Sequence, residues 1–414
     1  IFYIIILAWA LLYFFYCFRD PLPWATCNNP WNTGQYGLLT RSSASDRGIL
    51  SMSGGIQEVG TVKWDLLLCL LACWVACYCC IWKGVRFTGK VVYFTAVFPY
   101  VMLAILLVRG LTLPGAWQGV VYYLYPDPSR LADFQVWMEA CAQVLFSYSA
   151  ASGTLITLNS YNKFNNNCYK DSLWLCGLNS ATSFIAGFAG IPIDMVADSG
   201  PGLAFIVFPQ AVAMMPLPQL WAVCFFLMLI LLGLDTLFTG LETITSSMID
   251  MFPGQMRRPW RREIFLFFFC DTTLTYLFCG VQGGVYLFQL IDYYGASGIC
   301  IVFVSAVHCV AVGWAFGADR MCDAVQLMTG QRPSGYFKLC WRYFTPLICM
   351  VSSMERYKCI HNEGYVYPGW AYGLGWAMAL SSVAAVPIWA VVKICLTEGT
   401  LRQVRAPTHP AYLF

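Results

Sequence analysis

The chain has 414 residues, of which 59% are hydrophobic and 11% are charged. A water-soluble protein carries about 25% charged residues, so this composition indicates a chain whose main solvent is lipid. The net charge of +3 is too small to indicate a nucleic-acid partner, and most cysteines lie in apolar runs, where reduced packing residues are expected.

About ten membrane-spanning helices are predicted, because a hydrocarbon core needs roughly 20 apolar residues per helix. In chain order their ranges are 1–18, 64–82, 91–108, 136–158, 172–193, 220–247, 264–281, 296–316, 337–353 and 371–395. The sequence opens abruptly in an apolar run, so the first helix is expected to be the tail of a longer one. The prediction is a single transmembrane domain over 1–414.

The positions of Lys and Arg predict the orientation of these helices. Basic residues are enriched about two to one in one set of alternate loops, which is the bias of cytoplasmic loops. The loop 19–62 and the Pro- and Gly-rich stretch 194–219 are therefore expected outside the cell. The C-terminal tail, 396–414, is expected in the cytosol.

Polar residues inside the apolar spans are the candidate functional residues, because a polar group that faces lipid is costly. The span 136–158 combines Gln143 and Ser147 with a run of small and hydroxyl residues up to Gly153. One interpretation is a broken helix whose free carbonyls and half-helix dipoles bind ions and a zwitterion. The alternative is close helix packing through small residues.

Two other spans also carry polar side chains. Asn179 and Ser183 lie four residues apart and share a helix face, from which they can donate to an anion or to a neighbouring helix. Asp235 lies in the middle of its span, beside Thr236. A carboxylate beside hydroxyl and carbonyl oxygens is a site for a hard cation. The alternative for Asp235 is an ion pair with a Lys or Arg of another helix.

Ordered motifs extend along nearly the whole chain. They are Tyr3-Ile-Ile-Ile-Leu-Ala-Trp9, Pro30-Trp31-Asn32-Thr33, Ser199-Gly-Pro-Gly-Leu-Ala-Phe205, Leu232-Gly-Leu-Asp235-Thr, Asp292-Tyr-Tyr-Gly-Ala-Ser-Gly298 and Tyr367-Pro368-Gly-Trp370. Together they resemble the neurotransmitter:sodium symporter family, and within it the branch that carries GABA, betaine, taurine and creatine. The resemblance implies an all-α, LeuT-like fold of inverted repeats with broken helices, in which this chain begins at the third helix.

The resemblance also implies roles for individual residues. It implies sodium ligation by Ser147, Asn179, Leu232 (through its carbonyl), Asp235 and Thr236. It implies chloride ligation by Gln143, Ser147, Asn179 and Ser183. It implies substrate contacts for Tyr3, Phe146, Ser147, Tyr148, Ser149, Ser152, Thr236 and Gly240. It implies that Asp292 belongs to an outer gate and Asp250 to an inner gate.

The implied function is sodium- and chloride-coupled symport across the plasma membrane by alternating access, and not an enzymatic reaction. GABA is the first expected substrate, with betaine or taurine next. The implied partners are the lipid bilayer and a small zwitterion, without nucleic acid. The alternative is a non-transporting truncated or splice form of the same family, which would associate with full-length members, because the family's first two helices are not represented.

Overall fold

The computed structural model describes residues 3–20, 22–24, 53, 55–58, 60–82, 85–112, 116–125, 128–150, 152–188, 205, 208–213, 217–256, 260–273, 283–296, 299–353, 361–362 and 365–396. This part of the chain is helical apart from a short antiparallel pair, β1 (His361–Asn362) and β2 (Tyr365–Val366). The chain divides into two compact units. One consists of Ile1–Pro126 and Ser180–Phe288, and the other of Asp127–Asn179 and Gln289–Phe414.

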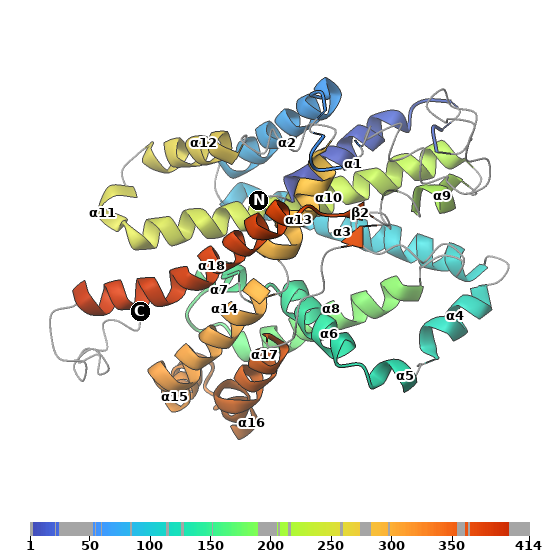
Figure 1. The fold of residues 1–414 in the computed structure, drawn as a ribbon. Coiled ribbons are helices and arrows are strands. Elements are labelled where there is room, and N and C mark those ends of the chain that lie inside the picture. Colours follow the sequence, from blue (N-terminus) through green and yellow to red (C-terminus); the bar gives the residue numbers. More distant parts are fainter. Residues whose placement is uncertain are drawn as a thin grey trace. The chain divides into compact units, whose positions relative to one another are not determined.

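The first unit is built around its longest helix, α10. Its helices are α1 (Ile4–Tyr16), α2 (Trp64–Trp82), α3 (Val85–Thr112), α4 (Ala116–Leu124), α9 (Phe208–Ala213), α10 (Pro218–Met251), α11 (Pro253–Met256), α12 (Arg261–Thr273) and most of α13 (Gly284–Ile291). In Figure 1, α10 lies along α1 and α3, and α1 also packs against α2. This arrangement makes α10 and α1 the central pair of the unit.

Aromatic side chains fill the core between these helices. Trp9 and Tyr13 of α1 are fully buried. The ring centroids of Trp9 and Phe288 are 5.4 Å apart, and those of Tyr13 and Phe226 are 5.2 Å apart. These side chains of α1 pack against other helices of the unit. This is typical of a helix inside a membrane bundle and not of a helix that faces lipid.

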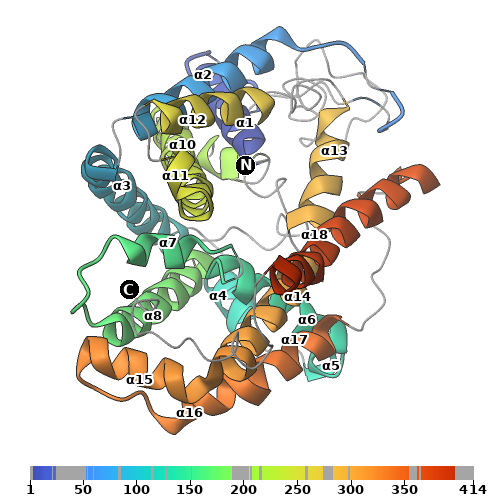
Figure 2. The same cartoon turned by 90° about the vertical axis from the view of Figure 1, so that its left-hand side faces the viewer.

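The second unit contains two helices that are interrupted by π-helical turns. Its elements are α5 (Pro128–Leu131), α6 (Phe134–Ser147), α7 (Thr154–Ser160), α8 (Cys168–Phe188) as far as Asn179, η5 (Asp292–Ala296), α14 (Ile299–Val310), η6 (Ala311–Gly317), α15 (Ala318–Thr329), α16 (Gly335–Leu339), η7 (Cys340–Phe344), α17 (Thr345–Ser353) and α18 (Gly369–Leu396). Helix α14 packs against α17, α18 and α6 (Figure 2).

The predicted spans agree with the described helices in type and order. The helix α2 has the predicted bounds, and α18 begins two residues before its predicted start. The span 136–158 is divided into α6 and α7, and the span 296–316 belongs to a longer helical run that continues into α15. Five helical segments are long and apolar enough to cross a membrane: Trp64–Ile81, Val92–Thr112, Pro218–Met251, Gly284–Thr329, of which residues 297–298 lie outside the described part, and Gly369–Val392.

Parts of several predicted segments lie outside the described residues. They include the far ends of the spans 172–193 and 264–281, most of the loops 19–62 and 194–219, and nearly all of the tail 396–414. In the second of these loops the described residues include the short helix α9 and the first residues of α10. The orientation of the chain and its treatment as one domain stay predictions.

One close backbone approach in the second unit gives a stability prediction. A Cβ on Gly313 of η6 would lie 2.7 Å from the carbonyl oxygen of Trp341 in η7, so a side chain there requires the backbone to move. Overpacking of this kind costs about 1–3 kcal/mol. We expect Gly313→Ala to lower the thermal unfolding midpoint of the detergent-solubilised protein.

The matched control for this substitution is Gly373→Ala in α18, where no atom beyond the adjoining backbone of its own helix lies within 4 Å of the added Cβ. Alanine has the higher helix propensity, so this control should unfold at the same temperature as the unmodified protein or slightly higher. Equal midpoints for the two variants would show that η6 and η7 are not held at the separation seen here.

Candidate functional site

The predicted break in a membrane-spanning helix is present between α6 and α7. The helix α6 ends at Ser147 and α7 begins at Thr154. Ser149 and Gly153 both adopt left-handed backbone conformations, with φ of 50° and 74°. The hydroxyl of Ser152 donates to the carbonyl of Ser149 at 2.9 Å and so stabilises the turn. The break itself is present as predicted, whereas ion and zwitterion binding there stays a prediction. The carbonyls at the end of α6 accept from backbone N–H groups of the turn that follows, so that of Val144 accepts from Tyr148 and that of Leu145 from Ala150.

Next to this break, two predicted ion-site residues meet. The side-chain amide of Asn179 in α8 donates to the hydroxyl oxygen of Ser147 at 2.8 Å. One residue further on, the hydroxyl of Tyr148 donates to the carbonyl of Cys176, also in α8, at 3.1 Å. These two bonds fix the end of α6 on α8.

The direction of the Ser147–Asn179 bond determines what the pair can still bind. A hydroxyl has one donor and two acceptor sites, and Ser147 uses only an acceptor site for Asn179. Its own O–H can therefore donate to an anion, while the amide oxygen of Asn179 can coordinate a cation. The predicted chloride ligands Gln143 and Ser183 each lie one helical turn from this pair, and neither makes a side-chain hydrogen bond to another described residue.

In the first unit, Asp235 of α10 is joined to Thr95 of α3. The Thr95 hydroxyl donates to Asp235 Oδ1 at 2.7 Å, and Thr95 itself is 2% exposed. Thr95 was not among the residues predicted from the sequence. In the sequence, Thr95 is notable only as a hydroxyl residue within an apolar span. Many threonines in membrane helices bond only to their own backbone, so this pattern does not indicate a functional residue.

The alternative of an ion pair for Asp235 is wrong for the described part of the chain. The ion pairs there join Arg262 to Glu242, Arg332 to Asp323, and both Lys338 and Arg342 to Asp319. The carboxylate of Asp235 therefore has a hydroxyl partner and no described protein cation. A carboxylate placed this way in a span keeps an oxygen for a bound cation.

The backbone around Asp235 adds further oxygen atoms. The hydroxyl of Thr236 donates to the carbonyl of Leu232 at 3.0 Å, and that of Thr239 donates to the carbonyl of Asp235 at 2.8 Å. The predicted ligand, the Leu232 carbonyl, also accepts the backbone N–H one helical turn on, so both of its lone pairs are used within the helix in this conformation. The Thr236 oxygen and the Asp235 carboxylate are the hard oxygen donors that remain.

Comparison with known proteins decides the identity of the chain. The profile of the Sodium:neurotransmitter symporter family matches residues 1–397. The chain belongs to this family. It is 46% identical over 450 residues to the sodium- and chloride-dependent taurine transporter of Canis lupus familiaris, with 99% of this chain and 73% of the relative covered. It is also 46% identical over 445 residues to the sodium- and chloride-dependent GABA transporter 2 of Bos taurus, with 99% and 74% covered.

A solved structure gives the fold independently. The crystal structure of MhsT in complex with L-phenylalanine matches with a TM-score of 0.67 at 20% identity, covering 85% of this chain and 78% of that one. The all-α, LeuT-like fold is confirmed. Membership of a symporter family also confirms that the chain is a membrane transport protein and not an enzyme.

The other predicted residues of this symporter are distributed over both units. In the first unit, Tyr3 precedes α1 and is half-buried, Gly240 has open space where a Cβ would lie, and Asp250 is exposed in the last turn of α10. In the second unit, Phe146 is 45% exposed on α6 and Asp292 begins the π-helical turn η5. The described hydrogen bonds thus join Thr236 to Leu232 and Asn179 to Ser147, and Asp235 and Tyr148 are sequence neighbours of these pairs. The roles of all these residues stay predictions.

Proposed function

We propose that the protein is a sodium- and chloride-coupled symporter of a small zwitterionic amino acid or osmolyte. The observation that carries this proposal is Asp235, a carboxylate inside a span that meets the Thr95 hydroxyl and no described protein cation. Relatives named as sodium- and chloride-dependent transporters share 46% of its residues. A sodium ion is the simplest group that balances such a charge in a low-dielectric core.

The ions would bind at two places. One sodium ion would take oxygens from Asp235, Thr236 and the Leu232 carbonyl. The pair Ser147 and Asn179 would serve a second sodium ion through the amide oxygen and chloride through the hydroxyl. Gln143 and Ser183 would complete the chloride site. Each inward-moving positive charge contributes about 2.3 kcal/mol per 100 mV of membrane potential to transport.

The names of the relatives support the proposed substrate class. They are named as taurine and GABA transporters, and both solutes carry an ammonium group separated by a short aliphatic chain from an anionic group. We propose GABA as the first substrate to test, with taurine and betaine next. The Tyr3 hydroxyl would donate to the anionic group and the Phe146 ring would cover the solute. Further contacts would come from Ser147, Tyr148, Ser149, Ser152, Thr236 and Gly240.

Alternating access would open this site to each side of the plasma membrane in turn. Asp292 would contribute to the outer gate and Asp250 to the inner one, and the C-terminal tail would lie in the cytosol. An epitope tag after Phe414 that an antibody reaches only in permeabilised cells would support this orientation. Staining of intact cells would reverse it.

Uptake in a cell line without endogenous transport tests the proposal. Labelled GABA, taurine and betaine are offered with sodium or chloride present or replaced, and uptake is normalised to protein labelled at the cell surface. A second version carries the first and second helices of a family member in front of residue 1. We expect at least one version to take up one of the solutes, with the uptake lost when either ion is replaced. Surface protein that takes up none of them in both versions contradicts the proposal.

A further inference from the structure

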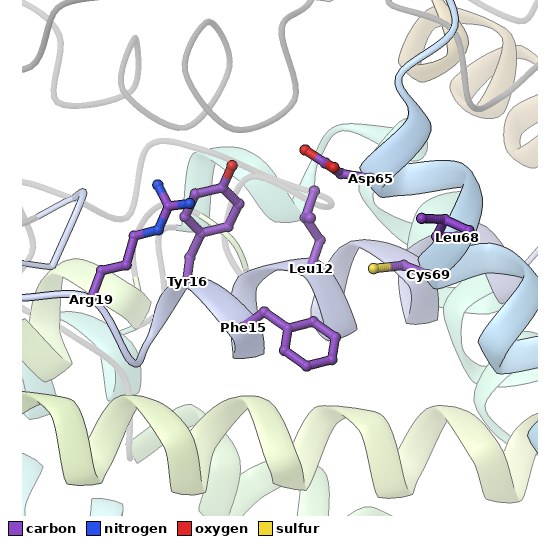
Figure 3. A pocket seen from close by; sticks show the side chains of 7 residues that line it. All are labelled: Leu12, Phe15, Tyr16, Arg19, Asp65, Leu68 and Cys69. Carbon is purple, nitrogen blue, oxygen red and sulfur yellow. The ribbon is translucent and has the colours of Figure 1, made fainter.

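A cavity that the proposed transport function does not use lies between α1 and α2. It has a volume of about 320 Å³ and is lined by Leu12, Phe15, Tyr16, Arg19, Asp65, Leu68 and Cys69 (Figure 3). All these residues belong to the first unit. None of them is among the predicted ion, substrate or gate residues, so the cavity needs an explanation of its own.

The ends of the two helices place this cavity at the membrane surface. The helix α1 ends at Tyr16 and α2 begins at Trp64. Arg19 lies just beyond the first helix, and Asp65 lies in the first turn of the second. The side chain of Trp64 is 70% exposed, and exposed tryptophans concentrate at the level of the lipid headgroups. The mouth of the cavity therefore lies at headgroup depth.

The deeper wall of the cavity is apolar and faces outward. Phe15 is 58% exposed and Leu68 is 61% exposed. Both belong to helices of a membrane protein, where exposed apolar side chains can contact lipid. Leu12 and Cys69 behind them are buried. An amphiphile with a polar end at the surface and an apolar end in the hydrocarbon matches this gradient from Arg19 and Asp65 to Phe15 and Leu68.

The rim carries opposite charges on two sides. The Arg19 guanidinium lies 4.4 Å from the centroid of the Tyr16 ring, and no ion pair joins Arg19 to Asp65 among the described residues. Figure 3 shows Arg19 to the left of Leu12, Asp65 above it and to its right, and Phe15 below it. Lys63 also faces Asp65: burial lowers the pKa of Lys63, and the Asp65 carboxylate partly opposes this shift.

We propose that this cavity binds the headgroup of a zwitterionic glycerophospholipid. Its phosphate would contact Arg19, because a guanidinium presents several N–H donors to phosphate oxygens. Its ammonium group would contact Asp65, which has acceptor sites beyond those facing Lys63. The first part of an acyl chain would lie on Phe15 and Leu68.

The charge pattern favours this lipid over other amphiphiles. An anionic phospholipid would satisfy Arg19 but place no positive group at Asp65. A sterol would offer a single hydroxyl group to a rim that carries both a guanidinium and a carboxylate, and it would partly dehydrate both. The lipid would also link the ends of α1 and α2, and α1 packs along α10, so binding should stabilise the first unit through linkage.

The test uses the purified chain in nanodiscs that contain photoreactive phosphatidylcholine, phosphatidylglycerol or cholesterol, each with its reactive group in the apolar part. After illumination, labelled peptides are identified by mass spectrometry. We expect phosphatidylcholine to label the peptides that contain Phe15 and Leu68. Arg19→Gln should reduce this labelling about tenfold, since one charge-assisted hydrogen bond is lost. Asp65→Asn should shift the preference toward phosphatidylglycerol.

The matched control is Arg130→Gln, which removes an exposed arginine at the end of α5, outside the cavity. It should leave the labelling unchanged, and circular dichroism shows whether each variant is folded. The proposal is overturned if folded Arg19→Gln is labelled like the unmodified chain. It is equally overturned if cholesterol or phosphatidylglycerol labels these peptides best in the unmodified chain. Because the readout is binding, its failure is distinct from any failure of transport.

Discussion

The Asp235→Asn variant is expected to lose sodium-dependent uptake almost completely. The substitution keeps the shape of the side chain and an oxygen that can accept from Thr95, but it removes the negative charge. At about 4 Å and an effective dielectric constant of about 20, a unit charge pair is worth about 4 kcal/mol. The sodium concentration for half-maximal uptake should therefore rise by roughly a thousandfold, beyond the range of any physiological buffer.

Two further variants separate the charge of Asp235 from its hydrogen bond. Thr95→Val removes the 2.7 Å bond and leaves the carboxylate, so sodium affinity should fall by about tenfold, the worth of one hydrogen bond to a charged group. Asp323→Asn removes an exposed carboxylate that pairs with Arg332 and should leave sodium dependence unchanged. Uptake by Asp235→Asn with normal sodium dependence would mean that Asp235 only holds α10 to α3.

The sequence contained enough information to locate the unusual residues, but not their partners. A carboxylate in a run of leucines is conspicuous because a charged group inside a membrane span is costly. Asp235 was predicted as a functional residue on that ground. Thr95 was missed because it lies 140 positions away, and hydrophobic periodicity carries no information about which helices become neighbours. The Asn179–Ser147 contact was anticipated only through the family resemblance.

The same limit applies to the helix interruptions. The break after Ser147 was predictable because Gly153 and a run of small residues provide a backbone that tolerates left-handed conformations. The π-helical turns η5, η6 and η7 were not predicted. Each inserts an extra residue into a helix, and neither the apolar run of η6 nor the charged residues of η5 and η7 distinguish these turns from continuous α-helix. The Gly313–Trp341 approach joins η6 to η7 and arises from tertiary packing.

A second large effect is expected at the junction of α6 and α8. Ser147→Ala removes the hydroxyl that accepts from Asn179 and that we propose donates to chloride. A hydrogen bond to a charged group contributes about 1.5–3 kcal/mol. The chloride concentration for half-maximal uptake should consequently rise by about tenfold to a hundredfold. The measurement is uptake against chloride concentration, with gluconate as the replacing anion and sodium held constant.

Ser160→Ala is the matched control, because the Ser160 hydroxyl donates only to the carbonyl of Thr157 in its own helix, α7. It should leave the chloride dependence unchanged.

Asn179→Ala distinguishes an ion site from helix packing, since it removes the same interhelical bond but leaves the Ser147 hydroxyl. If the pair serves only to join α6 and α8, the two variants should lower the thermal midpoint equally and leave both ion dependences intact. If Ser147 contacts chloride, its removal should change the chloride dependence more strongly than the loss of Asn179. The loss of Asn179 should instead weaken sodium binding, because its amide oxygen is the group left for a cation.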